Sequence, residues 1–291
     1  MPLKDILLAL LVMALWGANF GVSKMAMADF PPVMLMALRF ALVAALLVPF
    51  RKPPRQRKQV LGLAVTLGVF HFPFLFSGVN LLDASTSAIL MQLQVPFGVI
   101  LAAAILRDRI DLRIAAGIVL SFAGVVLIAG EPRFEGSMFG IVLILIAAFA
   151  FGLSSVQVKT LGPVDPLALN GWLALLMAIE LLILSLYVDG SPIPYIAAAG
   201  WRGWGGILFM APVASIVGYG LWFRLVGRYN VNQIMPFLLT VPLFAVVSGV
   251  LLQNDRPTWD VLAGGFLTVA GVALIVFDPL RLVRAPTINP S

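Results

Sequence analysis

Few side chains in this sequence could take part in catalysis. There is one histidine, His71, and no cysteine, which excludes disulfides, thiolate metal sites and a cysteine nucleophile. An enzyme embedded in a membrane would need a cluster of acids, bases or metal ligands, and one histidine does not supply it. No phosphate-binding loop is present, so ATP is not the direct energy source. The sequence therefore predicts no catalytic residue, no metal site and no cofactor, and favours a protein that is not an enzyme.

Three charged or titratable side chains interrupt long apolar stretches. Glu180 is the only carboxylate well inside such a stretch, which makes it the default candidate for proton coupling; few polar residues accompany it, which favours a peripheral position. His71 is the second candidate, because an imidazole changes charge near neutral pH, although a lone histidine is more often a packing residue. Arg39 lies at a depth from which an arginine can reach the membrane surface; we interpret it as structural, with direct contact to a substrate as the alternative.

Uncharged polar side chains and aromatic rings gather in the same stretches. A cavity lined by amides and rings, with few charges, suits a small amphiphile such as a zwitterionic amino acid with an apolar side chain. The alternative is that Ser, Asn and Gln only join neighbouring helices, at roughly 0.6 kcal/mol each. The residues predicted to bind substrate are Trp16, Asn19, Phe20, Ser77, Asn80, Gln92, Gln94, Ser154, Gln157, Tyr219 and Trp222.

Prolines fall inside four of the apolar stretches, at Pro73, Pro96, Pro212 and Pro242. A proline in a membrane helix leaves backbone groups that a neighbour or a cavity must satisfy. We predict that these residues kink helices that line a central cavity and bend during gating. The alternative is that they are packed kinks without a role in motion.

The elements that position these residues are membrane-spanning helices. The chain is 61% hydrophobic and 11% charged, whereas a soluble domain is about half apolar and a quarter charged. Apolar runs of about 20 residues, long enough to cross a bilayer, recur along the chain. An all-α membrane protein of ten transmembrane helices is predicted, with spans at 5–26, 32–50, 59–81, 85–106, 112–130, 136–158, 166–188, 203–226, 231–252 and 259–277.

The net charge of +6 is explained by orientation rather than by nucleic-acid binding. The basic residues flank the apolar runs, and most of them fall in the loops on one side of the membrane. The positive-inside rule then places both termini in the cytoplasm of a bacterial inner-membrane, multi-pass protein. The predicted partners are the lipid bilayer and a small-molecule substrate, with no nucleic acid.

The two halves of the sequence resemble each other. Gly17 aligns with Gly152 within an aromatic-glycine pair, and Pro96 aligns with Pro242. These matches predict one repeat over 1–134, a second over 135–280, and a disordered cytoplasmic tail over 281–291. Because each half holds five spans, the second half enters the membrane from the opposite side. Such inverted repeats provide two related conformations, each open to one side, with a substrate site near the midplane.

The fifth and tenth spans carry stripes of small residues, which permit close contact between helices. Gly117 and Gly124 mark the first stripe, and Gly264 and Gly271 mark the second. The stripes are packing surfaces, either within one chain or between two. A homodimer through helices five or ten is therefore left open.

Several motifs together resemble a known family. The run from Trp16 to Phe20 with a following Lys24, Pro32 followed by Arg39-Phe40, and a Ser/Thr-rich entry from Ala84 to Ala88 occur in this order. With the repeat, they are similar to the drug/metabolite transporter superfamily, EamA type, over nearly the whole chain. The resemblance implies ten helices in two inverted EamA repeats, cytoplasmic termini and export of metabolites. The members most similar to it are exporters of amino acids, including aromatic ones.

These observations predict a secondary transporter that exports amino acids and related metabolites across the inner membrane by alternating access. Uptake instead of export, or another cargo such as a nucleoside or a drug, remains open. A membrane-embedded enzyme is disfavoured by the lack of a catalytic cluster. A channel would show rings of charge or a carbonyl filter, and a scaffold would not need inverted halves.

Overall fold

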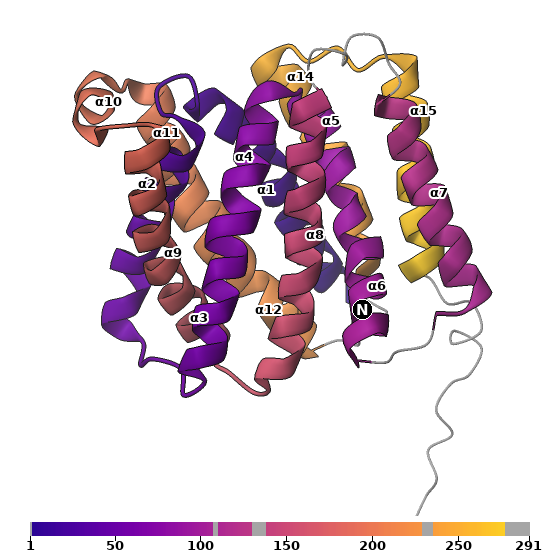
Figure 1. The fold of residues 1–291 in the computed structure, drawn as a ribbon, viewed down its shortest axis with the longest axis horizontal. Coiled ribbons are helices and arrows are strands. Elements are labelled where there is room, and N and C mark those ends of the chain that lie inside the picture. The colour runs from indigo at the N-terminus through magenta and orange to yellow at the C-terminus, as the bar shows by residue number, and fades with distance from the viewer. Residues whose placement is uncertain (1, 107–109, 130–137, 229–234, 277–291) are drawn as a thin grey trace, which may run out of the picture.

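The chain folds into helices throughout the part that the structure describes (Figure 1). The computed structural model describes residues 2–106, 110–129, 138–228 and 235–276, and no strand occurs among them. The predicted tail over 281–291 lies outside the described residues. The longer helices are α1 (Leu3–Ala26), α2 (Pro32–Leu47), α3 (Arg57–Val65), α4 (Phe72–Leu81), α6 (Gln94–Leu106), α7 (Leu112–Ala129), α8 (Met138–Leu161), α9 (Pro166–Val188), α11 (Trp201–Phe209), α12 (Gly218–Arg228), α14 (Val241–Gln253) and α15 (Trp259–Val276). The shorter segments are η1 (Val48–Phe50), η2 (Thr66–His71), α5 (Ala84–Leu90), η3 (Met91–Leu93), α10 (Pro192–Ala198), η5 (Met210–Val217) and η6 (Met235–Thr240).

Eight helical stretches of the described chain are long and apolar enough to cross a membrane. They coincide with the predicted spans one to four, six to eight and ten. Two shorter apolar helices, Leu112–Ile128 and Phe237–Gln253, lie where the fifth and ninth spans were predicted. An all-helical membrane fold is therefore confirmed, whereas the count of ten spans stays a prediction.

Helix geometry changes beside each of the four prolines. The third predicted span consists of α3, the π-helical η2 and α4, and the eighth consists of α11, the π-helical η5 and α12. Pro73 is the second residue of α4, which follows η2, and Pro212 lies within η5. Pro96 and Pro242 each lie near the start of a helix that follows a 3₁₀ segment, η3 or η6. Because proline lacks an N–H and clashes with the preceding turn, regular α-helix is interrupted at these places; their role in gating stays a prediction.

Four close pairings of helices organise the bundle. Helix α2 packs on α9, on the left of Figure 1, and α7 packs on α15, on the right. Between them, α1 packs on α14 and α6 packs on α8. The predicted alignment of the halves pairs α2 with α9, α7 with α15, α1 with α8 and α6 with α14. If each helix is replaced by its aligned counterpart in the other half, the same four helix pairs are therefore obtained.

Glycines bring these helices into close contact. A methyl group added at Gly17 would lie 2.5 Å from Cβ of Phe244 on α14. One added at the aligned Gly152 would lie 2.7 Å from the backbone nitrogen of Gly98 on α6. Both positions need the absence of a side chain, because packed helices tolerate little extra volume.

The small-residue stripes of α7 and α15 face each other inside the chain. A methyl group at Gly117 would lie 2.6 Å from the carbonyl oxygen of Gly271, and Gly124 makes an equally close approach to Gly264. The stripes are thus buried within one chain, and they are not free to join two chains. A homodimer through other faces of these helices stays a prediction.

Candidate substrate-binding site

Three of the predicted substrate residues form one aromatic cluster. The ring of Trp16 on α1 lies 5.1 Å from that of Tyr219 and 5.5 Å from that of Trp222, both on α12. The indole Nε1 of Trp16 donates a hydrogen bond of 3.2 Å to the carbonyl of Ala214. This carbonyl belongs to η5, where the π-helical turn departs from the regular hydrogen-bond ladder. The irregular turn therefore fixes the orientation of the indole ring.

Gly218 is needed for this cluster, and sequence reasoning missed it. A methyl group at Gly218 would lie 2.8 Å from Nε1 of Trp16, so a larger residue would displace the indole. No motif marks Gly218, because its role depends on how α1 and α12 cross.

Two predicted amides carry buried polar atoms that have no hydrogen-bond partner among the described residues. They are Oδ1 of Asn19 on α1 and Oε1 of Gln157 on α8. Asn19 lies three residues after Trp16, and residues at this spacing share a helix face. Because an unsatisfied buried acceptor is costly, the amide oxygen of Asn19 is suited to a donor on a ligand.

Other predicted polar residues are engaged in the fold. Gln92 is buried, and its Nε2 donates 3.2 Å to the carbonyl of Leu238, which joins η3 to η6. The hydroxyl of Ser154 donates 2.7 Å to the carbonyl of Phe151 in its own helix. These two side chains thus support irregular or crossing helices in this conformation.

The remaining predicted residues are spread over the bundle. Phe20 packs against the main apolar core. Ser77 and Gln94 are half-buried, and Asn80 is exposed at the end of α4. They stay predictions as substrate contacts.

The side chain of Arg39 points into the protein instead of reaching the membrane surface. It is 5% exposed, and its Nε and Nη2 atoms donate to Oγ of Ser215 at 3.1 and 2.9 Å. Nη1 faces the sulfur of Met36 at 3.9 Å, and the guanidinium lies over the ring of Phe40, 5.3 Å from its centre. Ser215 directly follows Ala214, whose carbonyl accepts from Trp16, so adjacent residues of η5 hold Arg39 and the aromatic cluster. In the sequence, the sign of a special role for Arg39 was a charge within a span. The direction in which its side chain points depends on tertiary packing.

His71 is enclosed at a different crossing. Its ring is 3% exposed and packs against Phe72 and Phe151, with centres 4.6 and 5.2 Å away. Nδ1 lies 2.9 Å from the carbonyl of Ala147 on α8. A carbonyl only accepts hydrogen bonds, so Nδ1 is the protonated nitrogen of the neutral ring.

Glu180 lies between α9 and the third span. Its Oε2 is buried without a hydrogen-bond partner among the described residues, and it lies against Gly68 in η2, where an added methyl group would displace the carboxyl group. The carboxylate is therefore next to an irregular helical segment.

Polar contacts close the end of the bundle at which α1 ends. Asp255 is 8% exposed, and its Oδ2 accepts hydrogen bonds from the backbone N and Oγ of Ser85, at 3.1 and 2.9 Å. Gln253 donates 3.2 Å to the carbonyl of Gly21, and Lys24 donates to the carbonyl of Leu82. The bonds of Asp255 and Gln253 join the two halves of the sequence at this end, and that of Lys24 lies within the first half.

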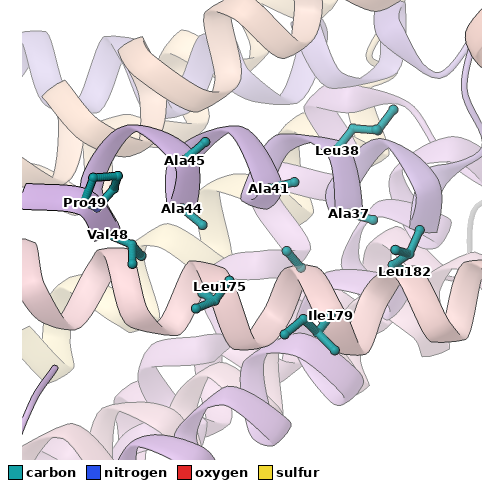
Figure 2. Close-up of a pocket in the computed structure, with 11 residues that line it drawn as sticks. Ala37, Leu38, Ala41, Ala44, Ala45, Val48, Pro49, Leu175, Ile179 and Leu182 are labelled. Atoms are coloured by element: carbon teal, nitrogen blue, oxygen red, sulfur yellow. The ribbon is translucent and has the colours of Figure 1, made fainter.

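An apolar groove of about 510 Å³ lies elsewhere, between α2 and α9 (Figure 2). The side chains drawn there are all hydrocarbon, among them Leu175, Ile179 and Leu182. Several of them are exposed on the outside of the bundle, where a membrane protein contacts lipid. The groove cannot recognise a polar solute, and it is distinct from the aromatic cluster.

Comparison with known proteins places these features in a family context. The EamA-like transporter family matches residues 3–130 and 138–277. A protein of Escherichia coli strain K12 described as a probable amino-acid metabolite efflux pump is 33% identical, over 95% of this chain and 96% of its own length. The Salmonella typhimurium protein of the same description is 32% identical, with the same coverage. A crystal structure with 19% identity has the same fold, with a TM-score of 0.67 over 97% of this chain and 99% of its own.

Proposed function

The chain belongs to the EamA-like transporter family, and from this premise we propose that it exports amino acids with apolar or aromatic side chains. The observation that carries the proposal is the cluster of Trp16, Tyr219 and Trp222, one helical turn from the unpartnered amide oxygen of Asn19. Rings offer apolar surface, and the amide offers an acceptor to an ammonium group. The relatives described as efflux pumps for amino-acid metabolites support the same cargo.

Alternating access between two inverted halves is the mechanism that we propose. Ten spans in two repeats, over 1–134 and 135–280, agree with helix pairings that survive exchange of the halves. The hydrogen bonds of Asp255 and Gln253 then close the outer end of an inward-facing or occluded state. The excess of basic residues on the other side supports cytoplasmic termini in a bacterial inner membrane.

A proton is the coupling ion in this proposal, and Glu180 carries it. Its buried, unpartnered oxygen contacts η2, so a change of its charge would act directly on an irregular segment of the third span. His71 is the second candidate from the sequence; its enclosed ring and its bond to Ala147 favour a packing role.

Counterflow into proteoliposomes tests the cargo. The full chain is reconstituted, loaded with unlabelled amino acid and supplied with labelled phenylalanine, leucine or alanine outside. Saturable uptake of phenylalanine and leucine is expected, with weaker uptake of alanine. Trp16→Ala should raise KM about 10-fold or more, because a buried aromatic contact contributes at least 1.4 kcal/mol.

Trp259→Ala is the matched control, because Trp259 is 82% exposed and distant in sequence from the cluster. It should leave KM unchanged. If no amino acid shows counterflow, the proposed cargo is wrong and the family assignment stands.

A further inference from the structure

We propose that Arg39 binds the carboxylate of the transported solute, with Ser215 as the residue that positions its guanidinium. The inference rests on the proposed export function and deepens it, because it names the group on the substrate that the site recognises. An α-amino acid, but not its amide or amine analogue, would then satisfy the site.

The first observation is a buried charge without a counter-ion. Arg39 is 5% exposed in the middle of a membrane helix, and a guanidinium keeps its charge there. Charges inside a membrane are expensive and are normally paired. Among the described residues the ion pair formed is that of Arg51 with Asp165, at 3.4 Å, and no described carboxylate pairs with Arg39. An anionic ligand would supply the missing charge.

The second observation is the arrangement of donors. Arginine has five N–H groups, and here Nε and Nη2 both donate to one oxygen, Oγ of Ser215. Nη1 has only the thioether sulfur of Met36, at 3.9 Å, and a thioether is a weak acceptor. Strong oxygen acceptors are thus absent for the outer edge of the guanidinium within the described chain. That edge, formed by Nη1 and Nη2, is one that binds carboxylates through two parallel hydrogen bonds.

The third observation is that Ser215 is held in place to accept. Its hydroxyl is 1% exposed and donates 2.9 Å to the carbonyl of Met210 in η5. With its hydrogen committed to that carbonyl, the oxygen directs its lone pairs to Arg39. The π-helical turn therefore fixes one edge of the guanidinium and leaves the other edge for a ligand.

The surroundings fit the rest of an amino acid. Arg39 donates to Ser215, and Trp16 donates to the carbonyl of the preceding residue, Ala214, so the charge borders the aromatic cluster. The amide oxygen of Asn19, on the same helix as Trp16, lacks a described partner and suits an ammonium group. Cation, rings and acceptor together match a carboxylate, an apolar side chain and an ammonium.

Three probes separate the groups of the substrate: L-phenylalanine, L-phenylalaninamide and 3-phenylpropionate. In counterflow with the reconstituted full chain, phenylalanine should have an apparent affinity about 10- to 100-fold above that of the amide, as expected for a charged hydrogen-bonded pair. Arg39→Met should reduce this ratio to within about twofold, mainly by weakening phenylalanine. Arg39→Lys should give an intermediate ratio, because it keeps the charge and loses the two-donor edge.

Arg55→Met is the matched control, since Arg55 is exposed in the loop before α3, and it should leave the ratio unchanged. If Arg39→Met does not fold, Ser215→Ala provides the test, because it keeps the guanidinium. It should raise KM for phenylalanine and not for the amide. An equal rise for both would overturn the positioning role.

The outcomes distinguish this inference from the proposed function. Equal transport of phenylalanine and its amide by the unchanged protein would overturn carboxylate binding by Arg39 and leave export intact. Transport of 3-phenylpropionate without phenylalanine would overturn amino-acid export and support the role of Arg39. Transport of neither acid would overturn both.

Discussion

At two helix crossings in this protein, a ring donates a hydrogen bond to a backbone carbonyl, and one partner is π-helical. The two crossings differ in how exposed these rings are. At the first, the ring of Trp16 on the regular helix α1 donates to a carbonyl of the π-helical η5. At the second, the ring of His71 on the π-helical η2 donates to a carbonyl of the regular helix α8. Trp16 and Tyr219 are half-buried, whereas His71 is 3% exposed. The first crossing thus leaves part of its hydrogen-bonded ring accessible, whereas the second encloses it.

The difference indicates that the proposed substrate site is asymmetric, although the helix pairings of the two halves match. Each crossing includes one π-helical segment: η5 supplies the accepting carbonyl at the first, and η2 carries the donating ring at the second. The side chains placed on that framework decide whether the crossing binds a ligand or holds helices together. Substitutions at matched positions test this distinction.

The largest effect is expected at the matched glycines of α1 and α8, which bring these helices against α14 and α6. Gly17→Ala and Gly152→Ala should each lower the free energy of unfolding by about 1–3 kcal/mol, because the added methyl group meets backbone atoms of the neighbouring helix. Thermal unfolding of the purified protein in detergent measures it. Gly62→Ala is the control, since nothing lies within 4 Å of the added group, and an equal loss there would contradict the close-packing explanation.

The second effect separates the crossings. Trp16→Ala should raise KM for phenylalanine about 10-fold or more with a small change in melting temperature, because it removes ligand surface. Phe151→Ala, at the aligned position beside His71, should lower the melting temperature and leave KM within about twofold, as a core truncation does. Counterflow and thermal unfolding of both variants give the comparison. An equal rise of KM in the two variants would show that the site is symmetric.

The third effect concerns the proton. An acidic outside pH should accelerate export severalfold if a proton enters as the solute leaves. Glu180→Gln should abolish this response and preserve counterflow, because the amide cannot release a proton. His71→Asn should retain the response, since His71 serves as a hydrogen-bonded packing residue. Efflux from loaded proteoliposomes, with and without a pH gradient, measures both, and a normal response in Glu180→Gln would exclude it as the carrier.

The smallest effect is expected at the closed end of the bundle. Asp255→Asn should weaken the hydrogen bonds to Ser85 by about 1–2 kcal/mol, which raises the population of the state open at that end. The chain has no cysteine, so Ser23→Cys, at a fully buried position near the end of α1, can report the opening. Its labelling by an impermeant maleimide from outside should be several times faster with Asp255→Asn. Unchanged labelling would show that these bonds do not hold the end closed.

The sequence predicted the fold better than the directions of single side chains. Hydropathy located the helices. Trp16, Tyr219 and Trp222 were predicted only as members of a longer set of substrate residues, and the contact of their rings follows from the crossing of α1 and α12. The sequence did not predict that Arg39 turns inward, since a partner such as Ser215 is set by the π-helical turn of another span. Nor did it predict the joining role of Gln92, whose acceptor is the carbonyl of Leu238 in the 3₁₀ segment η6, because this pairing depends on how two distant segments meet.

The glycine contacts of α7 and α15 have a consequence for assembly. Gly117 contacts Gly271, and Gly124 contacts Gly264. In the alignment of the halves, the first of these contacts corresponds to the second. This reciprocity is the mark of an isologous interface, of the kind that joins two identical subunits about a two-fold axis. The seam is therefore self-complementary, so two fragments separated between α7 and α8 carry the surfaces needed to reassociate in a membrane without a covalent link.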